Sequence, residues 1–376
     1  MDQVQLTSRG SRDAAARIEN CAASICQIIR RSACRYRRFL RHVMALGGKI
    51  SSRRKAHDMV MCRVQGAMCR VLVLSAACGL LGASTGASQQ PAGLRADNPD
   101  RWLAGAIDIH VHSSPDDRER SVDALEAAIM ARAHGMRAIV LKNHYDSTVG
   151  LVYLVRKQVP GLEVFGGIDL NLPAGGMNPA AVEHMAQVLG GFGCLVWMST
   201  FDAENQVRVS KESRPFVAVS KDGQLLQSTR DVIAVIAKRQ LAMATGHVSA
   251  QEGLMLIGEA RRQGVQRIVV THAMNTPVEM NVAQMQEAAR MGALMEFVGG
   301  TMLSADAPAR VERFADAIRK VGPEFCILSS DLGQKGNPLP ADGLAAFIAA
   351  IKAKGFSDPD IDRMTKQNPG KLLGLQ

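Results

Sequence analysis

The sequence predicts an α/β protein, a (β/α)8 barrel of the TIM type, on three observations. Eight short apolar runs follow one another from about residue 97 onward. Helical patterns separate them, and an alternation of strand and helix is typical of a parallel sheet. Eight such units over about 280 residues match a barrel, for which around 250 residues is typical. The runs cover residues 106–112, 138–144, 163–171, 194–200, 241–247, 267–273, 293–299 and 325–331.

The connection after the first run carries a clear helical pattern. Its apolar residues share one helical face, namely Val122, Leu125, Ile129 and Ala133. A doubly wound open sheet is the alternative architecture for the same alternation of strand and helix. The first run is not followed by Gly-x-Gly-x-x-Gly, which counts against the dinucleotide-binding form of that sheet.

Two capping-box patterns predict where later helices begin. Ser249-Ala-Gln-Glu252 opens the connection after the fifth run, and Thr276-Pro-Val-Glu279 opens the connection after the sixth. In a capping box the side chains of the first and fourth residues each bond the other residue's free backbone N–H. Pro277 would occupy the first helical position, where proline is favoured. We therefore expect one helix to open at each pattern.

Composition and charge limit the kinds of molecule that the protein is expected to bind. The chain has 376 residues, of which 47% are hydrophobic, enough for one large domain or two small ones. Its formal charge of +10 is uneven: residues 1–70 hold 15 Lys and Arg against 4 acidic residues, which leaves about −1 for the rest. A nearly neutral body is not expected to bind nucleic acid. We expect a small-molecule substrate, and the formation of homo-oligomers stays open.

The first ninety residues have the layout of an export signal. Residues 71–83 form an apolar run with Arg70 before it and small residues after it. The run is shorter than the about 20 apolar residues that a permanent membrane helix needs, so no stable membrane span is expected. We predict a basic leader over residues 1–67, either an over-extended start or a disordered segment, a signal peptide over 68–90, and the barrel over 97–376. The expected location is exported or periplasmic, with the cytoplasm as the alternative.

Cysteines follow the same division of the chain. Six of the eight lie within the first 78 residues, and only Cys194 and Cys326 lie in the body. Two cysteines do not make a disulfide framework. Both stand in apolar runs, so we expect small buried hydrophobic residues there.

Ionisable residues recur where the predicted strands end. In a barrel of this kind, catalytic groups lie at the carboxyl ends of the strands. A single histidine in such a place is commonly structural, but recurrence over several strands predicts a site. The residues are His110, His112, Lys142, His144, Asp169, His247, His272, Glu296 and Asp331.

His110-Val-His112 is the sharpest local signal. Alternate residues of a strand point the same way, so the two imidazoles can face one ion. Neutral imidazole suits zinc, iron and nickel, and a carboxylate completes a catalytic site that keeps a position for water. Lys142 and His144 have the same spacing, so both can face the lumen, although Lys142 could instead extend to the rim as a solvated charge.

Five segments resemble the amidohydrolase superfamily, from about residue 104 to the end of the chain. They are Asp108-Ile-His110-Val-His112, Ala244-Thr-Gly-His247, Val270-Thr-His272, Ser330-Asp331 and Asn368-Pro-Gly-Lys-Leu-Leu-Gly374-Leu. The resemblance implies a divalent metal, one or two ions, with zinc expected first and manganese or iron as alternatives. It implies that His110, His112, His247, His272 and Asp331 bind metal. It further implies that Asp331 accepts the proton of the attacking water and that the C-terminal segment is structural.

The fourth run departs from that superfamily. Many members with two metals carry a carbamylated Lys or a Glu there, and CLVWMST has neither. A second metal would therefore need a bridging ligand from Lys142, His144 or Asp169. Carbamylated Lys142 is the form that we include among the expected metal ligands.

Two further resemblances bear on function. DIHVHSSPD and VLKNH are similar to segments of the polymerase-and-histidinol-phosphatase (PHP) family of phosphoesterases, and Asp169 falls where that family places a carboxylate. The whole chain resembles an uncharacterised bacterial amidohydrolase-like group that shares HVHSSPD, LKNH, GGMNP and VWMST.

These patterns favour a metal-dependent hydrolase that cleaves a C–N or C–O bond (amide, cyclic amide, ester or lactone) of a small polar molecule. Asp331 would accept the proton, and Lys142 or His144 would stabilise the oxyanion. A PHP-type phosphoesterase, a mononuclear metal-dependent decarboxylase and a non-catalytic binding protein are the alternatives. The expected specificity loops follow the third, fourth and eighth runs, with the polar residues Asn171, Asp202 and Asn337.

Overall fold

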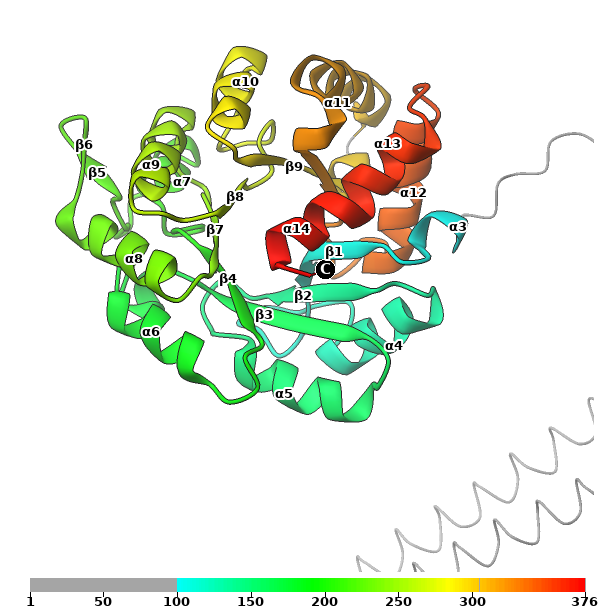
Figure 1. Ribbon diagram of the computed structural model, residues 1–376, viewed down its shortest axis with the longest axis horizontal. Helices are drawn as coiled ribbons and strands as arrows, with labels where there is room; N and C mark the ends of the chain where they lie inside the picture. The colour runs from blue at the N-terminus through cyan, green and yellow to red at the C-terminus, as the bar shows by residue number, and fades with distance from the viewer. Residues whose placement is uncertain (1–99, 304, 376) are drawn as a thin grey trace, which may run out of the picture. The chain divides into compact units, whose positions relative to one another are not determined.

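The computed structural model describes residues 100–303 and 305–375 (Figure 1). The chain divides into one unit over Met1–Ala92 and another over Gly93–Gln376. The predicted leader, the predicted signal peptide over 68–90 and their six cysteines lie outside the described residues, and they stay predictions. Among the residues that the structure does describe, no helix has both the length and the apolar character needed to cross a membrane.

Eight parallel strands form one sheet in chain order, which confirms the (β/α)8 class (Figure 1). The sheet closes into a barrel beside its first strand, because the amide of Asp331 donates to the carbonyl of His110 (3.0 Å) and the amide of His112 donates to Leu332 (2.9 Å). The strands are β1 (Ile107–His112), β2 (Ala138–Lys142), β3 (Glu163–Asp169), β4 (Gly193–Trp197), β7 (Ala242–Ala244), β8 (Arg267–Val270), β9 (Leu294–Val298) and β10 (Cys326–Ser329).

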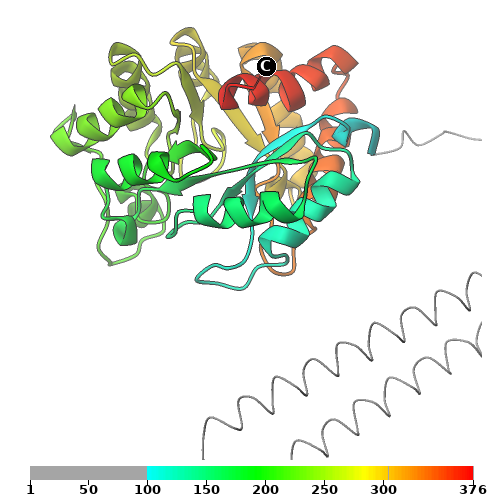
Figure 2. The same cartoon turned by 60° about the horizontal axis from the view of Figure 1, so that its bottom comes forward.

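Helices surround the strands on the outside, as two views of the ribbon show (Figures 1 and 2). A short antiparallel hairpin, β5 (Ser220–Lys221) and β6 (Gln224–Leu225), extends the connection between β4 and β7. The helices are α3 (Asp100–Leu103), α4 (Ala124–Ala133), α5 (Val149–Gln158), α6 (Pro179–Gln187), α7 (Glu204–Val209), α8 (Gln227–Lys238), α9 (Ala250–Arg262), α10 (Val282–Arg290), α11 (Ala307–Val321), α12 (Pro340–Lys352), α13 (Asp358–Asp362) and α14 (Asn368–Leu373).

The C-terminal helix α14 closes the amino ends of the strands. Its Leu372 and Leu373 are buried with Ile107 and Leu294, the first residues of β1 and β9. The Asn368 side chain donates to the carbonyls of Pro323 (2.9 Å) and Cys326 (2.6 Å). Cys194 and Cys326 are free and buried, as expected. The centre of this end of the barrel is therefore filled by apolar side chains.

The helix predicted after the first strand exists, but its predicted face is wrong. Asp123 caps α4, so Val122 precedes the helix, and the buried face is made of Ala124, Ala127, Ala128 and Ala131. Leu125 and Ile129 are 37% and 48% exposed. Small side chains let the helix lie close to the strands, and the larger apolar ones are left on its outer face.

One of the two predicted capping boxes is confirmed. Ser249 and Glu252 bond each other's backbone N–H at the start of α9. The prediction at Thr276–Glu279 is wrong, because Glu279 has a left-handed backbone (φ 48°) and no helix begins there. Asn281 caps α10 instead, in a capping box with Gln284, and the Thr276 hydroxyl bonds the Glu279 side chain (2.6 Å) inside a turn.

Candidate metal centre

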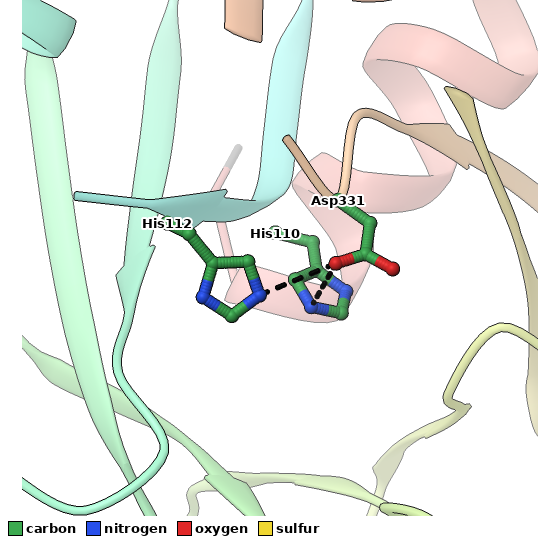
Figure 3. A group of neighbouring side chains, drawn as sticks. All are labelled: His110, His112 and Asp331. Carbon is green, nitrogen blue, oxygen red and sulfur yellow. Dashed lines mark ion pairs between the residues drawn. The ribbon is translucent and has the colours of Figure 1, made fainter. Parts of the chain in front are cut away.

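Three predicted ligands converge at the carboxyl end of the barrel. His110 and His112 come from β1, and Asp331 follows β10, the strand beside it. Asp331 Oδ1 lies 3.2 Å from His110 Nε2 and 3.2 Å from His112 Nε2 (Figure 3). Ligand atoms of all three lie within 4.8 Å of one another, and both histidines are buried. The two strands that close the barrel thus bring their polar ends together.

Two more predicted histidines meet beside this triad. His247 Nε2 lies 3.1 Å from His272 Nε2, and the His272 ring centre lies 6.3 Å from that of His110. His247 Nδ1 lies 2.8 Å from the Gln206 side-chain oxygen, so the other ring nitrogen of His247, Nε2, faces the cluster. His272 and Asp331 both have left-handed backbones, with φ 26° and 49°. Strained backbone of this kind is common where side chains are held for function.

Lys142 is deeply buried beside the histidines. Its Nζ lies 3.1 Å from Asp169 Oδ2 and 3.4 Å from His144 Nδ1, and its side chain is completely buried. The alternative that Lys142 extends to the solvated rim is therefore wrong. His144 Nδ1 also lies 3.0 Å from the Thr200 hydroxyl. Lys142, His144 and Asp169 thus form an ion-paired group beside the triad, with Lys142 opposite His112 on the neighbouring strand.

Glu296 contacts two of the cluster histidines, which its position in the sequence did not indicate. Its Oε1 lies 3.0 Å from His110 Nδ1 and accepts a hydrogen bond from Ser329 (2.6 Å), and its Oε2 accepts the His272 amide (2.9 Å). A carboxylate that accepts a hydrogen bond from Nδ1 keeps a proton on that nitrogen. The lone pair on Nε2 of His110 is then free to bind a metal ion. Glu296 therefore orients one histidine by its ring and another by its backbone.

Burial and neighbouring charges together set the protonation of the cluster. Burial lowers the pKa of His112, His144 and His247 well below the usual range, which keeps these imidazoles neutral. At His110 burial also acts to lower the pKa, but the carboxylates of Asp331 and Glu296 raise it above its ordinary value. Burial alone would raise the pKa of Asp331, but His110 and His112 lower it well below its ordinary value. Neutral imidazole and ionised carboxylate are the forms that bind metal.

The residues fit a divalent cation. Tetrahedral zinc with bonds near 2.1 Å would place its ligand atoms about 3.4 Å apart. The two distances of 3.2 Å at Asp331 and the 3.1 Å between His247 and His272 are close to that value. Within the described part of the chain, buried His272 Nδ1 and Asp169 Oδ1 have no hydrogen-bond partner. Nitrogen and oxygen donors suit zinc, manganese and iron alike.

The polar residues of the expected specificity loops have mainly structural contacts. Asn171 is fully buried, and its side chain bonds the backbone of His144 (2.6 Å) and Thr200 (2.9 Å), so it cannot face a substrate. Asp202 is buried against Arg214 (2.6 Å). Asn337 donates to the Gln334 side chain (3.2 Å). Asn171 joins the ends of β2, β3 and β4 beneath the site.

A (β/α)8 barrel with a histidine and carboxylate cluster at its carboxyl end is thus the class that fold and site define. Residues 105–296 match a family of unknown function (DUF6282), and because the match covers just over half of the chain, the protein belongs to this family. The matched range contains the five cluster histidines and Glu296 but ends before Asp331. No curated protein matches the chain.

Solved structures share the fold at low identity. An organophosphorus hydrolase from Deinococcus radiodurans is 16% identical, with a TM-score of 0.50 over 72% of this chain and 92% of that one. An amidohydrolase from Pseudomonas aeruginosa is 10% identical (TM-score 0.50, 73% and 98%). A phosphotriesterase homology protein from Escherichia coli, complexed with phosphate in its active site, is 15% identical (TM-score 0.51, 72% and 99%). None of these comparisons supports the resemblance to the PHP family.

Proposed function

We propose that this chain is a metal-dependent hydrolase that cleaves a C–N or C–O bond of a small polar molecule with an activated water. The convergence of His110 Nε2, His112 Nε2 and Asp331 Oδ1 carries the proposal. Support also comes from barrels of the same fold whose names describe an organophosphorus hydrolase and an amidohydrolase. Zinc is the cation that we propose first.

The residues divide the chemistry among them. His110, His112 and Asp331 would hold one cation, and His247 with His272 would complete its ligands or hold a second one. The cation would acidify water and polarise the scissile oxygen. Asp331, whose side chain is 25% exposed, would accept the proton from water and return it to the leaving group. Lys142 or His144 would stabilise the developing negative charge.

The test is metal analysis of the purified full chain, coupled to a screen of amides, lactones, carboxylic esters and phosphate esters. We expect at least one divalent ion per chain, and hydrolysis that a chelator abolishes and added zinc or manganese restores. Turnover of phosphate esters alone would favour a phosphoesterase over a hydrolase of C–N or C–O bonds, and release of carbon dioxide would favour the decarboxylase. A metal-free protein with unchanged activity would contradict the proposal.

The metal content of a Lys142 variant tests whether the site holds a second metal ion. A carbamate on Lys142 would bridge two ions, so Lys142→Ala is expected to lower the metal content from about two to one or less, with partial rescue by short carboxylic acids. Elemental analysis measures the change, and Lys221→Ala on the exposed hairpin is the matched control. A content of one ion in both proteins would make Lys142 the ammonium partner of Asp169 and remove the bridge.

A further inference from the structure

The short helix α7, which follows β4, carries two neighbouring amide side chains that contact His247. The Gln206 side-chain oxygen lies 2.8 Å from His247 Nδ1, and Asn205 donates to the carbonyl of His247 (3.1 Å). We propose that Gln206 is a positioning residue, which accepts a hydrogen bond from His247 Nδ1 and so directs the Nε2 lone pair of His247 at the metal ion. The inference rests on the proposed metal-dependent function and adds to it a residue that is not itself a ligand.

The position of one proton decides whether His247 can bind metal through Nε2. Burial lowers the pKa of His247 well below its usual range, so the imidazole is neutral and carries a single ring proton. With that proton on Nδ1, the Nε2 atom has a free lone pair, whereas a proton on Nε2 would occupy it. His247 Nε2 is the atom that lies 3.1 Å from His272 Nε2 inside the cluster. An acceptor at Nδ1 therefore selects the form of His247 that binds metal.

A second hydrogen bond sets which end of the Gln206 amide faces His247. The amide nitrogen of Gln206 donates to the hydroxyl of Ser210 (2.7 Å), the residue at the C-terminal end of α7. With its nitrogen directed to Ser210, the amide presents its oxygen on the other side, toward His247. An amide oxygen can only accept a hydrogen bond. The proton between Gln206 and His247 therefore belongs to His247 Nδ1.

The helix that carries Gln206 is fixed to the segments of both cluster histidines on its side of the barrel. Ala203, at the start of α7, and Val207, within it, are buried in the protein. Asn205 donates to the carbonyl of Pro277 (2.9 Å) as well as to that of His247. Pro277 lies in the segment that follows His272. These contacts hold Gln206 in one place relative to the ring that it orients.

Gln206 differs in charge from the residue that makes the corresponding contact at His110. There the carboxylate of Glu296 lies 3.0 Å from Nδ1. A carboxylate partner orients a metal-binding imidazole and also raises its basicity, whereas a neutral amide supplies the orientation alone. We therefore expect Gln206→Ala to weaken His247 as a ligand and Gln206→Glu to preserve or strengthen it.

The first experiment determines the tautomer of His247 in the full chain after removal of metal, so it depends on no activity. Long-range proton–nitrogen NMR spectra of histidine-labelled protein distinguish a proton on Nδ1 from one on Nε2, and His247→Gln identifies the signals. We expect the Nδ1–H form in the natural protein and in Gln206→Glu, and a shift toward the Nε2–H form in Gln206→Ala. Gln251→Ala, at an exposed position on α9, is the matched control. The Nε2–H form in the natural protein, or an unchanged spectrum in Gln206→Ala, would overturn the proposal.

The second experiment measures the affinity for zinc by competition with a chromogenic chelator. We expect Gln206→Ala to weaken the binding of the ion that His247 holds by about 10–100-fold, the usual effect of losing a partner that orients a ligand. Gln206→Glu should bind zinc at least as tightly as the natural protein, and Gln251→Ala and Gln251→Glu should match it. Equal losses in Gln206→Ala and Gln206→Glu, at unchanged melting temperatures, would overturn the inference.

The outcomes separate this inference from the proposed hydrolase function. Zinc affinities that follow the expected order, in a protein that hydrolyses none of the screened substrates, would support the role of Gln206 and contradict the hydrolase. Metal-dependent hydrolysis with the same zinc affinity and the same His247 tautomer in all Gln206 variants would support the hydrolase and overturn the role of Gln206.

Discussion

Asp331→Asn is expected to keep most of the metal while turnover falls by roughly 10²–10⁴-fold, the range that a positioned general base contributes. The amide keeps the shape and one oxygen that can face His110 and His112, each now 3.2 Å from Asp331 Oδ1. It removes the proton acceptor. Elemental analysis and steady-state kinetics on the same preparation separate the two effects.

Asp222→Asn is the matched control, because Asp222 lies on the exposed hairpin and its left-handed backbone (φ 50°) suits asparagine. Near-normal turnover in Asp331→Asn, with metal bound and an unchanged melting temperature, would contradict the role of Asp331. The search for the base would then turn to His144. Glu296 is the weaker candidate, since both of its oxygens already accept hydrogen bonds or face His110.

Glu296→Gln is expected to weaken metal affinity by about 10–100-fold, the usual effect of losing a partner that orients a ligand. The amide can present only one acceptor, whereas Glu296 serves His110 Nδ1 with one oxygen and the His272 amide with the other. One of the two histidines must therefore lose its orientation. Competition with a chromogenic chelator measures the affinity.

Glu287→Gln, on the exposed side of α10, is the control for that measurement. Visible spectra of the cobalt-substituted proteins give a second readout, because they report the geometry around the metal. A purely structural role for Glu296 would lower the melting temperature and leave the affinity and spectrum of the folded fraction unchanged. That result would exclude Glu296 as a positioning residue.

The sequence predicted the structure best where a pattern within one short segment determines the outcome. Strand-like runs with polar ends predicted the barrel and placed His110, His112 and Asp331 at the same end, because parallel strands share a direction. Side-chain roles that depend on packing could not be predicted. Alanines face the barrel in α4 because a close approach suits small side chains, and hydrophobicity alone favoured Leu125.

The contacts of Glu296 and Asn171 could not be predicted from the sequence for another reason. Each side chain bonds residues that lie 24 or more positions away in the sequence, such as His272 and His144. No local spacing records such a contact. The pocket lined by Arg118, Tyr145 and Phe201 could not be predicted for the same reason, since these residues belong to three different connections.

The seam where β1 meets the segment after β10 has a consequence for biosynthesis. His110 and His112 leave the ribosome more than two hundred residues before Asp331, yet the three ligand atoms lie within 4.8 Å of one another only after the seam has closed. A nascent chain that ends before β10 carries the histidine pair without its carboxylate. Under the proposed function, metal loading at the triad would therefore be a late event, and chains truncated before Asp331 would lack one of its three ligands.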